Sequence, residues 1–110
     1  MRPSPDFSRK VRELIDAQLE CGRARAAVIA AQLHMSRQTL YKRLKEENQT
    51  FAALLDHVRR EQALVHLYNP DETLTEVAQR LGFSELSAFS RAFKRWMGQS
   101  PARFRASHGL

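Results

Sequence analysis

Apolar residues in the stretch 73–105 recur at helical spacing in two neighbouring segments. Val77 and Leu81 share one face of a short first segment, and Phe89 and Phe93 share one face of a second. The apolar face of each segment must be buried, while its opposite face meets solvent. The pattern therefore predicts two amphipathic helices in succession.

The residues around these segments predict where the helices begin and turn. Thr73 and Glu76 stand at the spacing of a capping box, which starts a helix at Leu74. Gly82 follows where the chain needs positive φ to turn sharply, and Ser84 is the expected N-cap of the next helix. Helix, tight turn and helix together are typical of a helix-turn-helix motif.

A last short helix is expected after this motif. Gly98 is positioned to end the second helix, and Ser100 followed by Pro101 starts another, with serine as cap and proline in the first turn. Trp96 and Phe104 are expected in the core, and the tail 106–110 is expected to fray.

Residues 26–47 repeat the same logic earlier in the chain. Ala30, Leu33, Met35 and Ser36 correspond to Ala78, Leu81, Phe83 and Ser84 at an offset of 48 (78 − 30), and Leu40 and Leu44 correspond to Phe89 and Phe93 at 49 (89 − 40). The later unit thus has one extra residue near the start of its second helix. His34 stands in place of Gly82 and, like Asn48 further on, is among the residues that tolerate positive φ.

Two further helical runs complete the chain. One covers 7–21 and stops at Gly22; the longest covers 50–68 and stops at Asn69 and Pro70. The apolar positions of the long run are Phe51, Leu54, Leu55, Val58, Leu64, Val65 and Tyr68. Its charged residues Arg59, Arg60 and Glu61 are expected on a solvated face.

We therefore predict an all-α fold of about seven helices, with two helix-turn-helix subdomains joined by a long linker helix. The domain covers 7–110: the first subdomain is 7–48, the linker helix 50–68 and the second subdomain 73–105. Residues 1–6, with two prolines, are expected to be a linker remnant.

Charge points to a polyanionic partner. The chain carries a net charge of +6 and has a sequence pI near 10.2. No apolar run is long enough to span a bilayer and no signal-peptide pattern follows Met1, so we expect a cytoplasmic protein.

The sequence gives little support to an enzyme or a metal site. Cys21 is the single cysteine, and the four histidines have no metal-ligand spacing with it or with each other. Nucleophilic chemistry from Cys21 with a distant histidine is the alternative, but its place beside Gly22 at a helix end needs no such role. We expect no enzymatic activity, no metal and no cofactor.

Each motif leaves a polar face on its second helix. The first presents Gln38, Tyr41, Lys42 and Lys45, and the second presents Ser87, Arg91, Lys94 and Arg95. Gln can bond an adenine edge, Lys and Arg can donate to guanine, and Tyr can contact a thymine methyl group or a phosphate. A solvated face carries the same residue types, so the tandem repeat and the basic charge decide for DNA.

Two long strings carry a family resemblance. The second motif and its end read LGFSELSAFSRAFKRWMGQSPARFR, and the first motif and long helix read HMSRQTLYKRLKEENQTFAALLDHVRREQAL. Both resemble the DNA-binding domain of AraC-type (AraC/XylS) bacterial transcription regulators. One departure is Leu86, where members of that family often have proline.

The resemblance implies roles for individual residues. The family's base-reading positions fall on Gln38, Tyr41 and Lys42 in the first unit and on Ser87, Ala88 and Arg91 in the second. Candidates for phosphate contacts are Arg37, Arg43, Lys45, Arg95 and Arg103. Because Ala88 offers only an apolar contact, Arg91 is expected to carry most of the second unit's hydrogen-bond readout.

The expected function is sequence-specific binding of double-stranded promoter DNA, with the two recognition helices in consecutive major grooves. The run 50–68 would span roughly 28 Å, comparable to the ~34 Å turn of B-DNA. The resemblance also implies contact with RNA polymerase, as in an activator, and an N-terminal ligand-sensing domain that is missing here. Small stand-alone members of the family exist too, so Met1 is either a natural start or a boundary. In the alternative, only the first motif reads DNA, and the second binds RNA polymerase or a partner domain.

Overall fold

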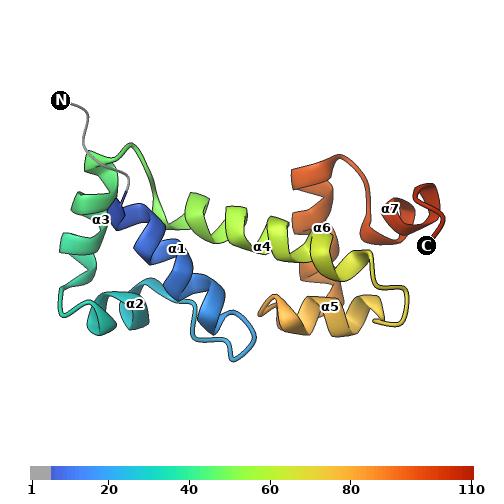
Figure 1. Cartoon of the computed structure of the whole chain (residues 1–110), viewed down its shortest axis with the longest axis horizontal. Coiled ribbons are helices and arrows are strands. Elements are labelled where there is room, and N and C mark those ends of the chain that lie inside the picture. Colours follow the sequence, from blue (N-terminus) through green and yellow to red (C-terminus); the bar gives the residue numbers. More distant parts are fainter. Residues whose placement is uncertain (1–5) are drawn as a thin grey trace. The chain divides into compact units, whose positions relative to one another are not determined.

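The computed structural model describes residues 6–110, which form seven α-helices and no strand (Figure 1). The helices are α1 (Asp6–Gln18), α2 (Ala26–Gln32), α3 (Arg37–Glu46), α4 (Phe51–Leu67), α5 (Leu74–Arg80), α6 (Leu86–Met97) and α7 (Pro101–Ser107). The prediction of an all-α fold with about seven helices is confirmed.

The chain divides into two compact units inside α4. The first unit runs to Val58 and the second from Arg59 to Leu110. The first half of α4 therefore belongs to the first unit and its second half to the other. Each unit consists of a helix, a pair of short helices and a closing helix, with α4 used by both.

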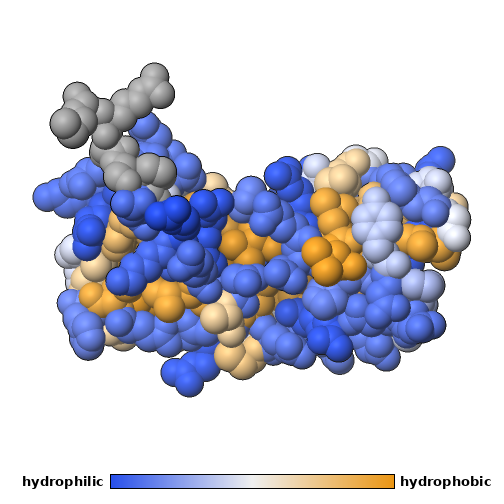
Figure 2. Space-filling view, in the orientation of Figure 1, coloured by the Kyte–Doolittle hydropathy of each residue, from blue (hydrophilic) through white to orange (hydrophobic). Residues whose placement is uncertain are grey.

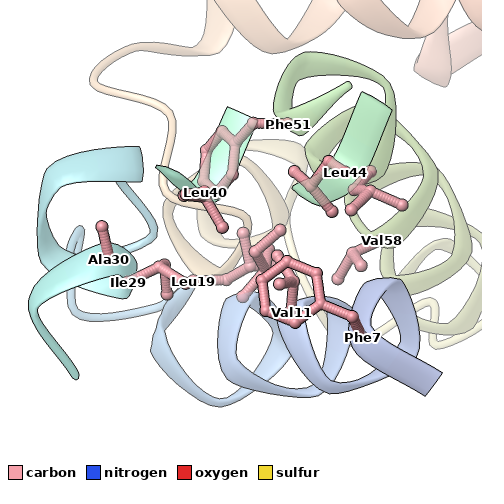
Figure 3. Close-up of a cluster of buried hydrophobic side chains, with 11 residues drawn as sticks. Phe7, Val11, Leu19, Ile29, Ala30, Leu40, Leu44, Phe51 and Val58 are labelled. Carbon is pink, nitrogen blue, oxygen red and sulfur yellow. The ribbon is translucent and has the colours of Figure 1, made fainter. Parts of the chain in front are cut away.

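The core of the first unit is mainly aliphatic (Figure 3). Its labelled side chains come from four helices: Phe7, Val11 and Leu19 belong to α1 or follow it directly, Ile29 and Ala30 to α2, Leu40 and Leu44 to α3, and Phe51 and Val58 to α4. Leu40 and Leu44 are fully buried, which fixes the side of α3 that faces inward. Burying apolar surface of this kind is the main force that holds the unit together.

The core of the second unit is largely aromatic. Phe93 lies at its centre, with ring centroids 5.8 Å from Phe89 and 5.5 Å from Phe104, both in edge-on geometry. Trp96 is half-buried and packs against the cluster at 6.5 Å from Phe93. Phe104 of α7 is buried, so the predicted core positions on α6 and α7 are confirmed.

The first helix differs from its predicted bounds at both ends. Asp6, assigned to the leader, is the first residue of α1; the rest of the predicted linker remnant, 1–5, lies outside the described residues. α1 ends at Gln18 rather than at 21, because the Arg23 N–H bonds to the Gln18 carbonyl at 3.2 Å and closes the turn through Gly22, which has φ +73°.

Burial along the second half of α4 also differs from expectation. The buried residues there are Ala63 and Leu67, whereas Val65 and Tyr68 are 65% and 53% exposed. Leu67 faces the core because it lies one turn after Ala63, and Val65 lies between them on the opposite side. Arg59 is half-buried rather than solvated, because its side chain contacts the Leu81 carbonyl and the Phe83 ring.

The end of the chain is ordered, so the prediction of a frayed tail is wrong. α7 continues to Ser107, and the His108 ring stacks on Phe104 with centroids 4.1 Å apart. The Leu110 N–H bonds to the Arg105 carbonyl at 2.9 Å. These contacts complete the last turn and satisfy its backbone groups.

Candidate nucleic-acid interface

Two positive-φ residues and one cap shape the turns before and after α3 in the first motif, which consists of α2 and α3. His34 has φ 58°, as its alignment with Gly82 predicts. The Ser36 hydroxyl accepts a hydrogen bond from the Thr39 N–H at 3.1 Å and starts α3. Asn48, at φ 60°, turns the chain after α3. All three residues therefore act in the turns where their residue types predict them.

The second motif, α5 and α6, begins as predicted but enters α6 differently. Thr73 and Glu76 form the capping box, and Gly82 has φ 82°. Ser84 is not the N-cap of α6: that position is Glu85, in extended conformation and with no side-chain hydrogen bond to the helix. The prediction for Ser84 is wrong because the extra residue of this unit moves the start of the helix by one position.

Helix bounds confirm that extra residue. α2 begins at Ala26 and α5 at Leu74, an offset of 48 (74 − 26). α3 begins at Arg37 and α6 at Leu86, an offset of 49 (86 − 37). Leu86 thus occupies the first helical position, where a proline would also be accepted because no intrahelical N–H bond is needed there.

The exposed face of α3 gathers the side chains predicted to read bases. Gln38, Tyr41 and Lys42 are all exposed, and Tyr41 presents 48% of its surface. Lys45 continues the same face one turn further. Tyr41 and Lys45 also border a mainly apolar groove of about 610 Å³ that extends to Phe51 at the start of α4. This face can offer hydrogen bonds, positive charge and an apolar surface together.

The exposed face of α6 is simpler. Ser87 and Arg91 are exposed, but Ala88 is half-buried. Arg91 is therefore the only long donor among the three predicted base readers of this unit. Glu85 stands exposed at the start of the helix and adds a negative charge there. The face can make fewer directed contacts than the face of α3.

The predicted phosphate contacts are all exposed cations, in different settings. Those side chains are Arg37, Arg43, Lys45, Arg95 and Arg103. The Arg43 guanidinium lies 3.9 Å from the centroid of the Phe7 ring, which holds its charge at the edge between α3 and α1. Arg103 follows the Ser100 cap in the first turn of α7. Hydrophilic residues cover most of the face that Figure 2 shows of either unit.

Two arginines that sequence reasoning missed close helix ends in the second unit. Arg59 Nε donates to the Leu81 carbonyl at 3.0 Å, beyond the end of α5. Arg105 Nε donates at 3.0 Å to the carbonyl of Leu67, the last residue of α4, and one of its terminal nitrogens donates at 2.9 Å to the Asn69 carbonyl just after that helix. Both satisfy carbonyls that a helix end leaves open.

A partly buried ion-pair group joins α4 to α5. The Glu72 carboxylate, 12% exposed, bonds to His66 Nδ1 at 2.9 Å and pairs with Arg80. Burial acts to raise the pKa of Glu72, but the hydrogen bond and charge of His66 and the charge of Arg80 outweigh it, and the pKa is lowered. No sequence spacing marks this group, because the turn 68–73 brings its members together.

The described part of the chain offers few side chains suited to catalysis or metal binding. Cys21 is exposed, with its Sγ 3.3 Å from the Gln18 carbonyl oxygen. Residues 6–110 contain no group of three or more histidine, cysteine or acidic side chains arranged to hold a metal ion. Within the same residues no helix is long and apolar enough to cross a membrane.

Comparisons with known proteins agree with this architecture. Residues 29–107 match the model of a helix-turn-helix domain family. The HTH-type transcriptional regulator VirS of Mycobacterium tuberculosis is 38% identical over 104 residues, which cover 94% of this chain and 31% of that protein. The chain thus spans about a third of the length of the first curated relatives it matches.

Solved structures share the fold. A DNA-binding transcriptional dual regulator from Escherichia coli superposes with a TM-score of 0.86 at 26% identity, covering 94% of this chain and 93% of the other. The DNA-binding domain of AdpA, a global transcriptional factor solved in complex with a target DNA, superposes with a TM-score of 0.78 at 29% identity, covering 92% and 91%. The chain therefore belongs to the AraC-type helix-turn-helix family.

Proposed function

We propose that this chain is the DNA-binding part of a bacterial transcription regulator and that it recognises double-stranded DNA by sequence. The observation that carries the proposal is the pair of motifs whose second helices, α3 and α6, each expose polar and cationic side chains opposite a buried face. The similarity to AdpA, which was solved on its target DNA, supports the same function.

In this proposal α3 and α6 enter consecutive major grooves on one side of the duplex. Gln38 contacts an adenine edge, Lys42 donates to guanine and Tyr41 contacts a thymine methyl group or a phosphate. In the second unit Arg91 donates to guanine, while Ser87 and Ala88 make short-range contacts.

The exposed cations Arg37, Arg43, Lys45, Arg95 and Arg103 would bind phosphates and set the register. Because α3 and α6 present different side chains, one monomer would read an asymmetric site. The net charge of +6 supports a salt-dependent affinity.

The proposal extends to the whole protein. In this proposal the whole protein acts in the cytoplasm as a regulator without enzymatic activity, metal or cofactor. It contacts RNA polymerase when it activates transcription, and it carries a ligand-sensing domain N-terminal to this region. The lengths of the curated relatives support the last point, since this chain matches 31% of VirS.

The test is selection of binding sites from random duplex DNA by the 110-residue chain, repeated with Lys42→Ala and Arg91→Ala. We expect two preferred blocks about one helical turn apart, each weakened by one substitution at a cost of ~1–3 kcal/mol. Lys10→Ala, on an exposed face of α1, removes the same charge as Lys42→Ala and is the control. Enrichment of no sequence at low salt would overturn the proposal, and a single block sensitive only to Lys42 would assign the second unit to RNA polymerase or a partner domain.

A further inference from the structure

One side chain of α4 contacts the turn of the second motif in three ways. Arg59 Nε donates to the Leu81 carbonyl at 3.0 Å, and a terminal nitrogen donates to the Gly82 carbonyl at 3.5 Å. The same guanidinium lies 4.2 Å from the centroid of the Phe83 ring. Three consecutive turn residues are thus held by one rigid, planar group.

These contacts lead directly to the proposed recognition helix. Phe83 packs against Phe89 of α6 with ring centroids 5.7 Å apart and lies 6.4 Å from Trp96. Helix α6 has no side-chain cap of its own, since Glu85 makes no hydrogen bond to it. The start of α6 therefore depends on the turn before it more than the start of α3, which Ser36 caps.

The repeat shows that this contact is specific to the second unit. At the offset of 48, Arg59 corresponds to Val11 (59 − 48), which is fully buried in the first core. The neighbouring positions keep their character, because Ile15 and Ala63 (63 − 48) are both fully buried. The second unit thus has an arginine at the position where the first has a core valine, and this arginine reaches the turn.

We propose that Arg59 is a positioning residue that fixes the direction of α6 on DNA, and that it sets base specificity in the second unit without contacting a base. The proposal rests on the proposed function. Loss of the two hydrogen bonds and the ring contact would let the turn 81–85 take several conformations. Arg91 would then reach its base pair in only some of them.

The variant Arg59→Gln removes the guanidinium, and Arg60→Gln, at the adjacent exposed residue, is the control with the same loss of charge. We expect Arg59→Gln to lose about tenfold of its preference in the block that Arg91→Ala weakens, and to keep the block that Lys42→Ala weakens. Arg60→Gln should keep both. Phe83→Leu should weaken the same block, and its combination with Arg59→Gln should be less than additive.

Two measurements distinguish an effect on the direction of α6 from an effect on folding of the second unit. Fluorescence of Trp96, the single tryptophan, reports whether the second unit is folded. Amide exchange without DNA should become about tenfold faster in the turn 81–85 and the first turn of α6, and stay unchanged in α3. This second result holds even if the wild-type chain enriches no sequence, so failure of the proposed function remains distinguishable.

A second variant, Arg59→Lys, keeps the charge but lacks the planar guanidinium, and it should show the same selective loss. This variant replaces Arg59→Gln in the test if Arg59→Gln unfolds the unit. The proposal would be overturned if Arg59→Gln weakened both blocks equally. It would also be overturned if folded Arg59→Gln left both blocks and the amide exchange unchanged. Exposure of Trp96 in both Arg59 variants would also overturn it, because the residue would then be needed to fold the unit.

Discussion

The two units use the same helical plan but stabilise it with different chemistry. Ile15 and Ala63 correspond at an offset of 48 (63 − 15), and Leu54 and Phe104 at 50 (104 − 54); all four are buried. In the first unit the core is mainly aliphatic and the entry to α3 has a neutral serine cap. The second unit relies on aromatic rings, charged side chains and a glycine turn.

The comparison shows that the two repeated units share most of their buried positions and differ in their turns, their helix ends and one core position. Where the first unit has Val11, His34 and the cap Ser36, the second has Arg59, Gly82 and Glu85. Each difference lies beside α5 or at the start of α6. Because two of these three residues are charged and the second unit also contains the Glu72 ion-pair group, this unit is expected to respond more strongly to pH and to changes of charge.

The largest effect expected from a single substitution is a cavity in the aromatic core. Phe93→Ala should lower the free energy of unfolding of the second unit by about 3–5 kcal/mol, because Phe93 is fully buried among other rings. Denaturant unfolding followed by Trp96 fluorescence reports this unit, and circular dichroism reports both. We expect the fluorescence transition to move to lower denaturant and part of the helical signal to remain.

Leu44→Ala is the matched variant in the first unit, since Leu44 is also fully buried. It should destabilise that unit by about 2–5 kcal/mol and leave the Trp96 transition in place. A single shared transition in both variants would contradict independent units and show that α4 couples their unfolding.

The next largest effect is a difference between the two units in how their stability responds to acid. The pKa of Glu72 is lowered, so its stabilising contribution is present above the ordinary glutamate value of about 4.3 and is lost as the pH falls through the lower folded value. The corresponding position in the first unit is Ala24 (72 − 48). Glu72→Gln should destabilise the second unit by about 1–2 kcal/mol at neutral pH.

The measurement is the Trp96 unfolding transition of wild type and Glu72→Gln between neutral pH and pH 3. The difference between the two proteins should shrink as the pH falls. Glu46→Gln, at an exposed residue of α3, is the control and should leave the Trp96 transition unchanged. A difference that stays constant with pH would show that the ionised form of Glu72 contributes nothing.

Much of this architecture could be predicted from local residue types. The capping box at Thr73, the positive φ of His34 and Gly82 and the one-residue insertion all depend on residues close in sequence. The N-cap of α6 could also be predicted from the sequence. The offset of 49 that relates Leu40 to Phe89 places the counterpart of Ser36 at Glu85 (36 + 49), not at Ser84.

The missed contacts depend on tertiary packing. Arg59 meets a carbonyl 22 residues away and Arg105 one 38 residues away, so no short spacing indicates either. One signal did exist for Arg59, because the repeat aligns it with buried Val11. A charged residue at a core position needs partners, and the carbonyls of Leu81 and Gly82 after the end of α5 accept hydrogen bonds from it.

A smaller effect is expected from the two turns. His34 and Gly82 share the left-handed region at φ 58° and 82°. His34→Gly removes the Cβ that strains this backbone conformation, but glycine loses more conformational entropy on folding. The net effect should stabilise the first unit by a few tenths of a kcal/mol up to about 1. Gly82→His should destabilise the second unit by about 1–2 kcal/mol.

Thermal unfolding by circular dichroism, with Trp96 fluorescence for the second unit, measures both changes. Ala31→Gly, at an exposed position inside α2, is the control for glycine in the first unit and should destabilise by about 1 kcal/mol. A loss of stability in His34→Gly would show that the imidazole makes a contact that outweighs the backbone strain.

The smallest effect concerns the uncapped start of α6. Glu85→Asp keeps the negative charge and shortens the side chain to one that can accept a bond from the third residue of the helix, so the second unit should gain about 0.5–1 kcal/mol. Glu85→Ser also supplies a cap but loses the favourable interaction of a carboxylate with the helix dipole, about 0.3–1 kcal/mol, so its gain should be smaller.

DNA affinity should order these variants differently. The exposed Glu85 carboxylate stands at the end of α6 that would approach phosphates, so Glu85→Ser should bind a selected duplex several-fold more tightly at low salt, while Glu85→Asp should not. Glu13→Gln, an equal charge change at an exposed residue of α1, controls for net charge. Equal affinity gains in Glu85→Ser and Glu13→Gln would mean that only the overall charge matters. A gain confined to Glu85→Ser would place the start of α6 near the phosphate backbone, where Arg37 at the start of α3 is proposed to bind a phosphate. The charge at the start of this helix would then be a functional difference between the two units.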